Sequence, residues 1–234
     1  WTVDLGIGYG GPVVKDGKVY LLDRDNAVGD KMRCFDLNTG EELWRFEYDA
    51  AGEVMFPGSR SVPIVDDKHV YSTGPYGDLY CIDIKTHQPV WKVNIWTDFG
   101  GDPGHDTIDY GGFGGSVNFP IWAVAQCPLI YGDLLIVLSQ APEAGAVAYN
   151  KTTGEMVWNT PNFGNESYAS PSIAKIDGED HIVAVISSTN PIGRRDLPQT
   201  LGKIVGIEPL TGEILWEYDQ WECHISVAPA VDAG

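Results

Sequence analysis

One short phrase, repeated four times and closed each time by a tryptophan, constrains this chain more than any other feature. It reads FDLNTGEELW at residues 35–44 and returns at residues 82–91, 149–158 and 207–216. The closing residues are Trp44, Trp91, Trp158 and Trp216. Self-similarity at a period of roughly 40–50 residues, with several short strands in each unit, is typical of a propeller array.

Each unit contains signals for four short strands. In the first unit, Asp16-Gly17 supplies the positive φ of a tight hairpin turn, and the repeated phrase supplies the turn between the third and fourth strands. The glycine of the second turn is Gly40, Gly154 or Gly212, and His87 stands in its place in the second copy. Histidine is enriched at positive φ, so this turn survives the replacement. The pattern predicts an all-β chain of four-stranded antiparallel blades.

The repeated tryptophan has a physical role that requires no chemistry. A large flat ring on the outer strand can wedge between neighbouring blades and stack over the next Thr-Gly turn. Burying such a ring stabilises the fold by roughly 3–5 kcal/mol, at about 25 cal/mol per Å². We therefore expect the four tryptophans and their partner glycines to be structural docking residues.

The phrase resembles the tryptophan-docking repeat of the PQQ-like, quinoprotein-type propellers. Members of that family include the quinoprotein alcohol dehydrogenases and the non-catalytic lipoprotein of the outer-membrane barrel-assembly machine. The resemblance implies a propeller in a periplasmic or secreted protein. It does not choose between an enzyme and a scaffold, because the same repeat carries both.

The repeats also predict where the blades lie. We expect four complete blades at about residues 9–48, 60–95, 122–160 and 168–219, with half-blade strands at residues 1–5 and 225–232. The resemblance implies a closed ring of seven or eight blades, so that further blades of the same protein complete it.

Composition excludes one class of partner. The formal net charge of −18 comes from 33 acidic against 15 basic residues. Such a charge repels a phosphate backbone, and no basic stripe is present, so nucleic acid is not expected as a partner. No apolar run approaches the length of a transmembrane segment, and the sequence shows no signal peptide.

The long connections all belong to one face of the predicted propeller. Turns between the first and second strands, and between the third and fourth, share one face and are tight. The connections on the opposite face are residues 24–30, 47–60, 96–120, 161–168 and 190–200. Long loops on a rigid scaffold commonly carry binding, so we expect this face to bind a protein or peptide.

Several residues of these connections are candidates for the binding face. Aromatic rings could anchor a partner or pack onto the insert itself, and a basic pair could clamp a carboxylate or phosphate or pair with Asp196. The candidates are Phe56, Trp96, Phe99, Tyr110, Phe113, Phe119, Arg194 and Arg195.

The longest insert also contains a candidate metal site. Carboxylates and a histidine alternate with glycines there, and calcium prefers six to eight oxygen ligands. An acidic, glycine-rich loop can equally be solvated. The candidate ligands are Asp102, His105, Asp106 and Asp109.

The cysteines are interpreted as structural. Cys34 and Cys81 occupy the same repeat position, where the later copies have Ala148 and Gly206, so this position favours a small side chain. The remaining pair, Cys127 and Cys223, matches no metal-binding spacing.

Two functions from different classes follow from these features. The first is a binding or scaffold module that acts through the loop-rich face and needs no cofactor. The alternative, implied by the resemblance, is part of a quinoprotein alcohol or sugar dehydrogenase that uses PQQ and calcium and whose catalytic residues lie partly outside this segment. The sequence contains no adjacent cysteine pair and no recognisable hydrolytic set, and we assign no catalytic residue from it.

Overall fold

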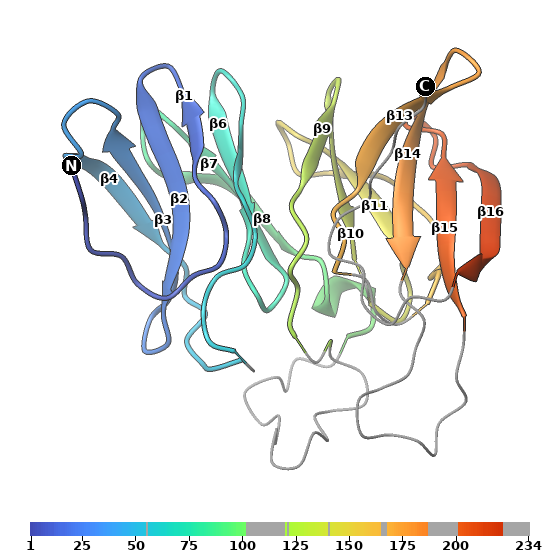
Figure 1. The fold of residues 1–234 in the computed structure, drawn as a ribbon, viewed down its shortest axis with the longest axis horizontal. Coiled ribbons are helices and arrows are strands. Elements are labelled where there is room, and N and C mark those ends of the chain that lie inside the picture. The colour runs from blue at the N-terminus through green and yellow to red at the C-terminus, as the bar shows by residue number, and fades with distance from the viewer. Residues whose placement is uncertain are drawn as a thin grey trace.

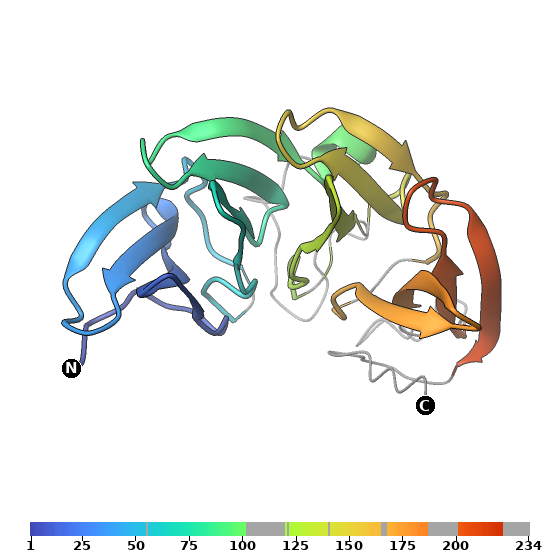
Figure 2. The same cartoon turned by 90° about the horizontal axis from the view of Figure 1, so that it is seen from above.

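Four antiparallel sheets, each of four strands, make up the chain in a computed structural model (Figure 1). The structure describes residues 1–54, 56–101, 120, 122–139, 141–164, 168–186 and 201–221. Viewed from above, the sheets stand side by side in a curved row (Figure 2). The predicted all-β propeller architecture is therefore confirmed.

Each sheet is a simple meander in which sequential strands are neighbours. The first sheet contains β1 (Val13–Lys15), β2 (Lys18–Asp25), β3 (Gly29–Asp36) and β4 (Glu42–Glu47). The second contains β5 (Ile64–Val65), β6 (His69–Thr73), β7 (Asp78–Asp83) and β8 (Pro89–Asn94). The third contains β9 (Leu129–Tyr131), β10 (Leu134–Leu138), β11 (Ala146–Asn150) and β12 (Met156–Asn159). The fourth contains β13 (Ser172–Ile176), β14 (Glu179–Ile186), β15 (Gly202–Ile207) and β16 (Ile214–Trp221), and a short 3-10 helix, η1 (Thr97–Phe99), follows β8.

The repeated tryptophan always faces the same small position across the sheet. The register pairs Cys34 with Trp44, Cys81 with Trp91, Ala148 with Trp158 and Gly206 with Trp216. A bulge lies next to this pair in every sheet, and its extra residue is on the fourth strand, directly before the tryptophan, so the fourth strand bends where the indole needs room. The small residue is required because a larger one would fill the space that the ring occupies.

The repeated turn is held by its own acidic or amide side chain. Asp36 Oδ1 accepts hydrogen bonds from the backbone N–H groups of Asn38 and Thr39, at 2.9 and 2.8 Å. Equivalent bonds form at Asp83, Asn150 and Glu208 in the other three sheets. The turn closes on a left-handed residue, with φ of 75° at Gly40 and 59° at His87. Histidine therefore does take the glycine conformation there.

The first three repeated indoles, Trp44, Trp91 and Trp158, each reach from their own sheet to the turn of the next one, whereas Trp216 Nε1 donates to His181 Nδ1 of its own sheet at 2.9 Å. Trp91 Nε1 donates to the Lys151 carbonyl at 3.0 Å, and Trp158 Nε1 donates to the Pro209 carbonyl at 3.1 Å. Trp44 instead stacks on His87, with ring centroids 5.0 Å apart and planes 13° apart. These contacts join neighbouring sheets at the repeated turn.

The hydrophobic core is divided among the spaces between sheets. One cluster joins the first and second sheets through residues such as Met32 and Ile82, and another joins the second and third through Leu79 and Leu135. A third cluster lies between the third and fourth sheets. The fold is thus stabilised between blades rather than around a single centre.

One predicted loop is a hairpin instead. Residues 24–30 were expected to form a long connection, but β2 runs to Asp25 and β3 begins at Gly29. The expectation was wrong because Arg24 and Asp30 are both fully buried and pair across the two strands.

Candidate functional site at the loop-bearing face

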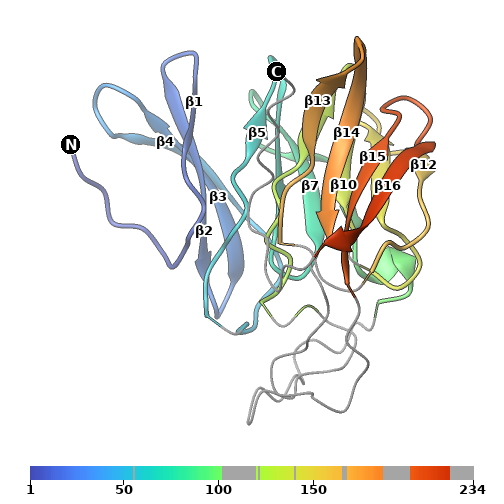
Figure 3. The ribbon, with the colours of Figure 1, turned by 45° about the vertical axis from the view of Figure 1, so that its right-hand side comes forward.

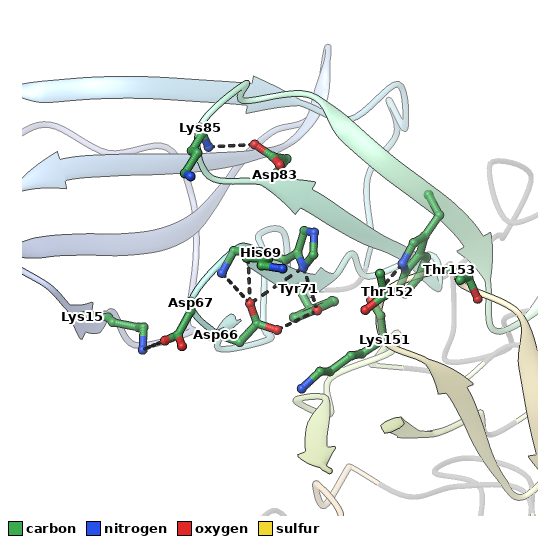
Figure 4. A network of polar contacts seen from close by, with 12 residues as sticks. Lys15, Asp66, Asp67, His69, Tyr71, Asp83, Lys85, Lys151, Thr152 and Thr153 are labelled. Atoms are coloured by element: carbon green, nitrogen blue, oxygen red, sulfur yellow. Dashed lines mark hydrogen bonds and ion pairs between the residues drawn. The ribbon is translucent and has the colours of Figure 1, made fainter. Parts of the chain in front are cut away.

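The two faces of the propeller use their polar groups differently. At the tight-turn face (Figure 4), Asp66 Oδ1 accepts from the backbone N–H groups of Lys68 and His69, both at 2.8 Å. The Tyr71 hydroxyl donates to Asp66 Oδ2 at 3.0 Å. These bonds hold turns in place. Among the described residues, the connection from β4 to β5 and the helix η1 lie at the opposite end of the strands (Figure 3). We call this end the loop-bearing face.

A buried ion pair lies beneath this face, at the end of the β2–β3 hairpin. Arg24 Nη1 donates to Asp30 Oδ2 at 2.6 Å, and neither side chain is exposed. The guanidinium lies over the Tyr76 ring, 5.0 Å from its centroid. Tyr76 belongs to the second sheet's β6–β7 connection, so the pair is enclosed between two blades.

Burial dominates the titration of the Asp30 carboxyl. The pKa of Asp30 is raised from 3.8 to about 6, mainly by burial and in smaller part by the nearby Asp78 carboxylate. Arg24 and the Ser59 hydroxyl oppose this shift by stabilising the charged form. Asp30 therefore sits where a carboxylate is held at considerable electrostatic cost.

The ion pair fixes both ends of the connection between the first two blades. Arg24 Nη2 donates to the carbonyls of Ala50 and Gly52, at 2.6 and 2.9 Å. The Ser59 hydroxyl donates to Asp30 Oδ1. A single charged pair thereby positions Ala50, Gly52 and Ser59 on the loop-bearing face.

From Ser59 the network continues to the surface. The Ser59 carbonyl accepts from the Tyr9 N–H at 2.7 Å, and its N–H donates to the Ile7 carbonyl at 3.3 Å. Arg60 donates from its two terminal nitrogens to the carbonyls of Gly58 and Phe56, each at 2.5 Å. The same guanidinium lies 5.7 Å from the centroid of the Tyr9 ring. Two surface segments are therefore built onto one buried anchor.

A second set of contacts joins the segments that lead into the inner strands. The Val62 N–H donates to the Cys127 sulfur at 3.2 Å, and the Cys127 N–H donates to the Ser170 hydroxyl at 2.8 Å. These residues precede β5, β9 and β13 respectively. The contacts join the second, third and fourth blades side by side on the inner side of the row.

The predicted aromatic candidates divide into different environments. Phe56 is exposed, whereas Trp96 is buried and packs with Val54, Tyr76 and neighbouring alanines. Phe99 is half-buried against two of the core clusters. The sequence left open whether these rings anchor a partner or pack within the protein. Trp96 packs within the protein and is not available to a partner in this structure.

The other candidates lie outside the described residues. These are the metal candidates Asp102, His105, Asp106 and Asp109, the aromatics Tyr110, Phe113 and Phe119, and the basic pair Arg194 and Arg195. The roles given to them stay predictions.

The residues that the structure describes do not fit a calcium site. No group of three or more His, Cys, Asp or Glu side chains is arranged there to hold a metal. The fully buried carboxylate of this face, Asp30, already uses both oxygens on Arg24 and Ser59. Calcium requires several free oxygens, so we derive no step through calcium or PQQ.

The cysteines of the described chain are free thiols. Cys34 and Cys81 are buried opposite the docked tryptophans, and burial raises the pKa of Cys34 to about 11 and that of Cys81 to about 12. Cys127 is half-buried. Buried thiols with raised pKa values are unreactive, which fits the structural interpretation.

Sequence reasoning missed the residues that organise this face. Arg24, Asp30, Ser59 and Arg60 were not singled out because a charged residue in a presumed loop is usually solvated. One signal was available. Arg24 lies two residues before the Asn26–Val28 turn, and Asp30 lies two residues after it. Symmetric opposite charges at such a turn can pair directly across the hairpin.

The geometry of these blades corresponds to a known class, the PQQ-like repeat propellers. The chain belongs to the family described as outer membrane protein assembly factor BamB, whose profile matches residues 28–228. No helix in the described part of the chain is long and apolar enough to cross a membrane.

Individual relatives include enzymes and an assembly factor. A quinoprotein ethanol dehydrogenase from Pseudomonas aeruginosa is 28% identical over 188 residues, which cover 78% of this chain and 26% of the relative. BamB from Moraxella catarrhalis has a similar structure, with a TM-score of 0.56, 17% identity, and coverage of 95% of this chain and 52% of BamB. A europium-containing methanol dehydrogenase aligns with a TM-score of 0.55 and 15% identity, over 89% of this chain and 41% of the enzyme.

These matches cover only part of each relative. The chain spans about a quarter of the curated dehydrogenase and about half of BamB. The structural matches establish the shared fold, and the relatives' activities belong to the relatives.

Proposed function

We propose that this chain is a binding or scaffold module that presents a protein or peptide site on its loop-bearing face. The supporting observation is the buried Arg24–Asp30 pair, which fixes Ala50, Gly52 and Ser59 on that face. A buried ion pair usually adds little net stability relative to apolar packing. Its geometry here fits a positioning role, because each partner also holds a different part of the same connection.

The blades supply the rigid support for such a site. Under this proposal, the docked tryptophans and the turn glycines keep the blades in a fixed relation, and further blades of the same protein complete a ring of seven or eight. The protein would act in the periplasm or outside the cell, as the resemblance of the repeat implies.

Site-specific photo-crosslinking in cells tests the proposal. A photoreactive amino acid is placed in the full-length protein at Ala27, Phe56 or Glu143 on the loop-bearing face. The matched controls carry it at Asn38 or Leu210 in the tight turns. We expect protein adducts from the loop-bearing positions and none from the controls. Adducts confined to the tight turns, or adducts at neither face, would contradict the proposal.

A quinoprotein dehydrogenase remains the second candidate because the alignment with quinoprotein ethanol dehydrogenase covers most of this chain. Its PQQ and calcium ligands would come partly from other blades. Calorimetric titration of the full-length protein with PQQ and calcium tests it, together with dye-linked oxidation of ethanol. Saturable binding with alcohol-dependent dye reduction would establish the enzyme, and the absence of both would exclude it.

A further inference from the structure

An exposed apolar patch lies directly above the buried ion pair. Its three large side chains are Ile7, Tyr9 and Phe56, with exposed fractions of 48%, 64% and 59%. Ile7 packs against the backbone of Gly58, where an added Cβ would lie 2.9 Å from Ile7 Cγ2. Arg60 joins the other two residues, because it binds the Phe56 carbonyl and lies over the Tyr9 ring. The two segments that carry these side chains, far apart in sequence, are therefore joined at the patch by Arg60 and by the Ile7–Gly58 contact.

The backbone at Phe56 is strained in order to display this ring. Its φ of 57° lies in the left-handed region, where a bulky aromatic residue is a genuine outlier. No burial compensates for the strain, since the ring is exposed. Instead, Arg60 holds the conformation by donating to the carbonyls of Phe56 and Gly58. Strain of this kind, held by surrounding structure, clusters at ligand-binding sites.

The exposed charges that border the patch are mainly acidic. Arg60 is the one basic residue of segments 1–10 and 48–62, and its guanidinium is bound to the Phe56 and Gly58 carbonyls. Asp4, Asp49 and Glu53 are exposed and lie in the same two segments as the patch residues. Within the described residues, none of the three carboxylates takes part in an ion pair, whereas Asp25 at the neighbouring hairpin pairs with Lys31 at 3.3 Å. An apolar patch bordered by free carboxylates is complementary to apolar groups flanked by cations.

We propose that Ile7, Tyr9 and Phe56 form a docking surface for an extended polypeptide segment that carries apolar side chains between basic ones. The inference rests on the proposed function and specifies where the partner binds and what its chemistry is. Aromatic residues at the centre of an interface commonly dominate its affinity, so Phe56 and Tyr9 would act as anchors. Anionic lipid headgroups and nucleic acid are disfavoured by the same carboxylates that attract a basic segment.

Binding of a defined peptide tests this surface. The probe is a fluorescein-labelled nonapeptide in which lysine alternates with valine and phenylalanine, and the control peptide has glutamate in place of lysine. Fluorescence anisotropy measures the affinity of each for the full-length protein. We expect saturable binding of the basic peptide alone, which weakens as the salt concentration rises.

The decisive variant is Phe56→Gly. Glycine adopts positive φ without strain, so this variant should unfold at the same temperature as wild type or higher. Its affinity for the basic peptide should nevertheless fall at least about tenfold, as expected for the loss of an aromatic anchor. The matched control is Val157→Ser. This substitution alters a side chain of similar exposure on β12 and should leave the affinity unchanged.

Three results would overturn the inference. These are equal affinity of wild type and Phe56→Gly for the basic peptide, equal affinity of the acidic peptide, and preferential binding of phosphatidylglycerol vesicles. Crosslinking distinguishes this failure from failure of the proposed function. If adducts still form at Ala27 and Glu143 while the peptide result is negative, the loop-bearing face binds its partner elsewhere. If no adducts form on that face, both ideas fail.

Discussion

Removing either member of the buried Arg24–Asp30 pair should destabilise the fold, but the two losses should depend differently on pH. In the wild-type protein, burial raises the pKa of Asp30 from 3.8 to about 6. The folded state therefore holds this proton more tightly than the unfolded state does. The stability that the group contributes is fully present below about pH 3.8 and is lost as the pH rises through 6, by about 3 kcal/mol in total. Above that pH the carboxylate is ionised in both states, and its contribution no longer changes.

Removing the Arg24 guanidinium should make the loss of stability with rising pH continue above pH 6. In Arg24→Met, Asp30 is buried without a counter-ion and must keep its proton for the protein to stay folded. The free energy of unfolding should then continue to fall by about 1.4 kcal/mol per pH unit, or about 3 kcal/mol between pH 6 and pH 8 beyond wild type. The variant also loses the bonds to Ala50 and Gly52, which adds a penalty independent of pH.

Removing the anion should behave differently. An arginine does not lose its proton at accessible pH, so Asp30→Asn leaves a charged Arg24 in a buried site. We expect a penalty of about 3–5 kcal/mol that is constant from pH 6 to pH 8.

Urea unfolding of the full-length variants, followed by tryptophan fluorescence at pH 6, 7 and 8, measures these effects. Lys203→Met serves as the control. It breaks a partly exposed 3.0 Å pair with Glu217 and should cost less than about 1 kcal/mol at every pH. If the stability of Arg24→Met followed that of wild type at all three values, or if Asp30→Asn cost no more than the control, the ion pair would not anchor the loop as argued.

Two further predictions concern the repeat itself. Gly154→Ala places a Cβ 2.7 Å from the docked indole at a φ of 77°, and should cost about 2–3 kcal/mol by thermal unfolding. Gly132→Ala, at a φ of 58° with open space around it, should cost about 1 kcal/mol, and equal losses would argue against docking. Iodoacetamide labelling at pH 8, mapped by mass spectrometry, should modify Cys127 and spare the buried Cys34 and Cys81 in the folded protein. Modification of all three at equal rates would contradict the burial of the last two.

The sequence was sufficient to predict the sheets because their signals are local and repeated. The small residue at positions 34, 81, 148 and 206 and the tryptophan ten residues later recur because one geometric need recurs in each blade. The glycine turn is equally local, since only residues that tolerate positive φ can close it. His87 shows that even an exception could be interpreted from the sequence, because its φ of 59° and its stacking on Trp44 satisfy the same turn.

The candidate site could not be predicted in the same way because its contacts are not local. Arg24 and Ser59 are 35 positions apart along the sequence and are joined through Asp30. Trp96 illustrates the converse problem. A tryptophan in a long connection suggests an exposed anchor, but the ring is covered by Val54 and Tyr76, which belong to other connections. Whether an aromatic residue in a loop is packed or displayed depends on which loops fold over it, and the period of the repeat carries no information about that.

The difference between the faces follows from how each one satisfies its polar groups. At the tight-turn face, the side chain that begins each turn accepts the turn's own N–H groups, so Oδ1 of Asp36 and of Asp83 is occupied by neighbours in sequence. At the loop-bearing face, the carbonyls of Ala50 and Gly52 have no such local donors and are held by Arg24 from the first hairpin. A face held by local bonds must look alike in every blade, whereas a face held by long side chains can differ from blade to blade. Relatives of one fold that include both dehydrogenases and an assembly factor can therefore share the first face and diverge at the second.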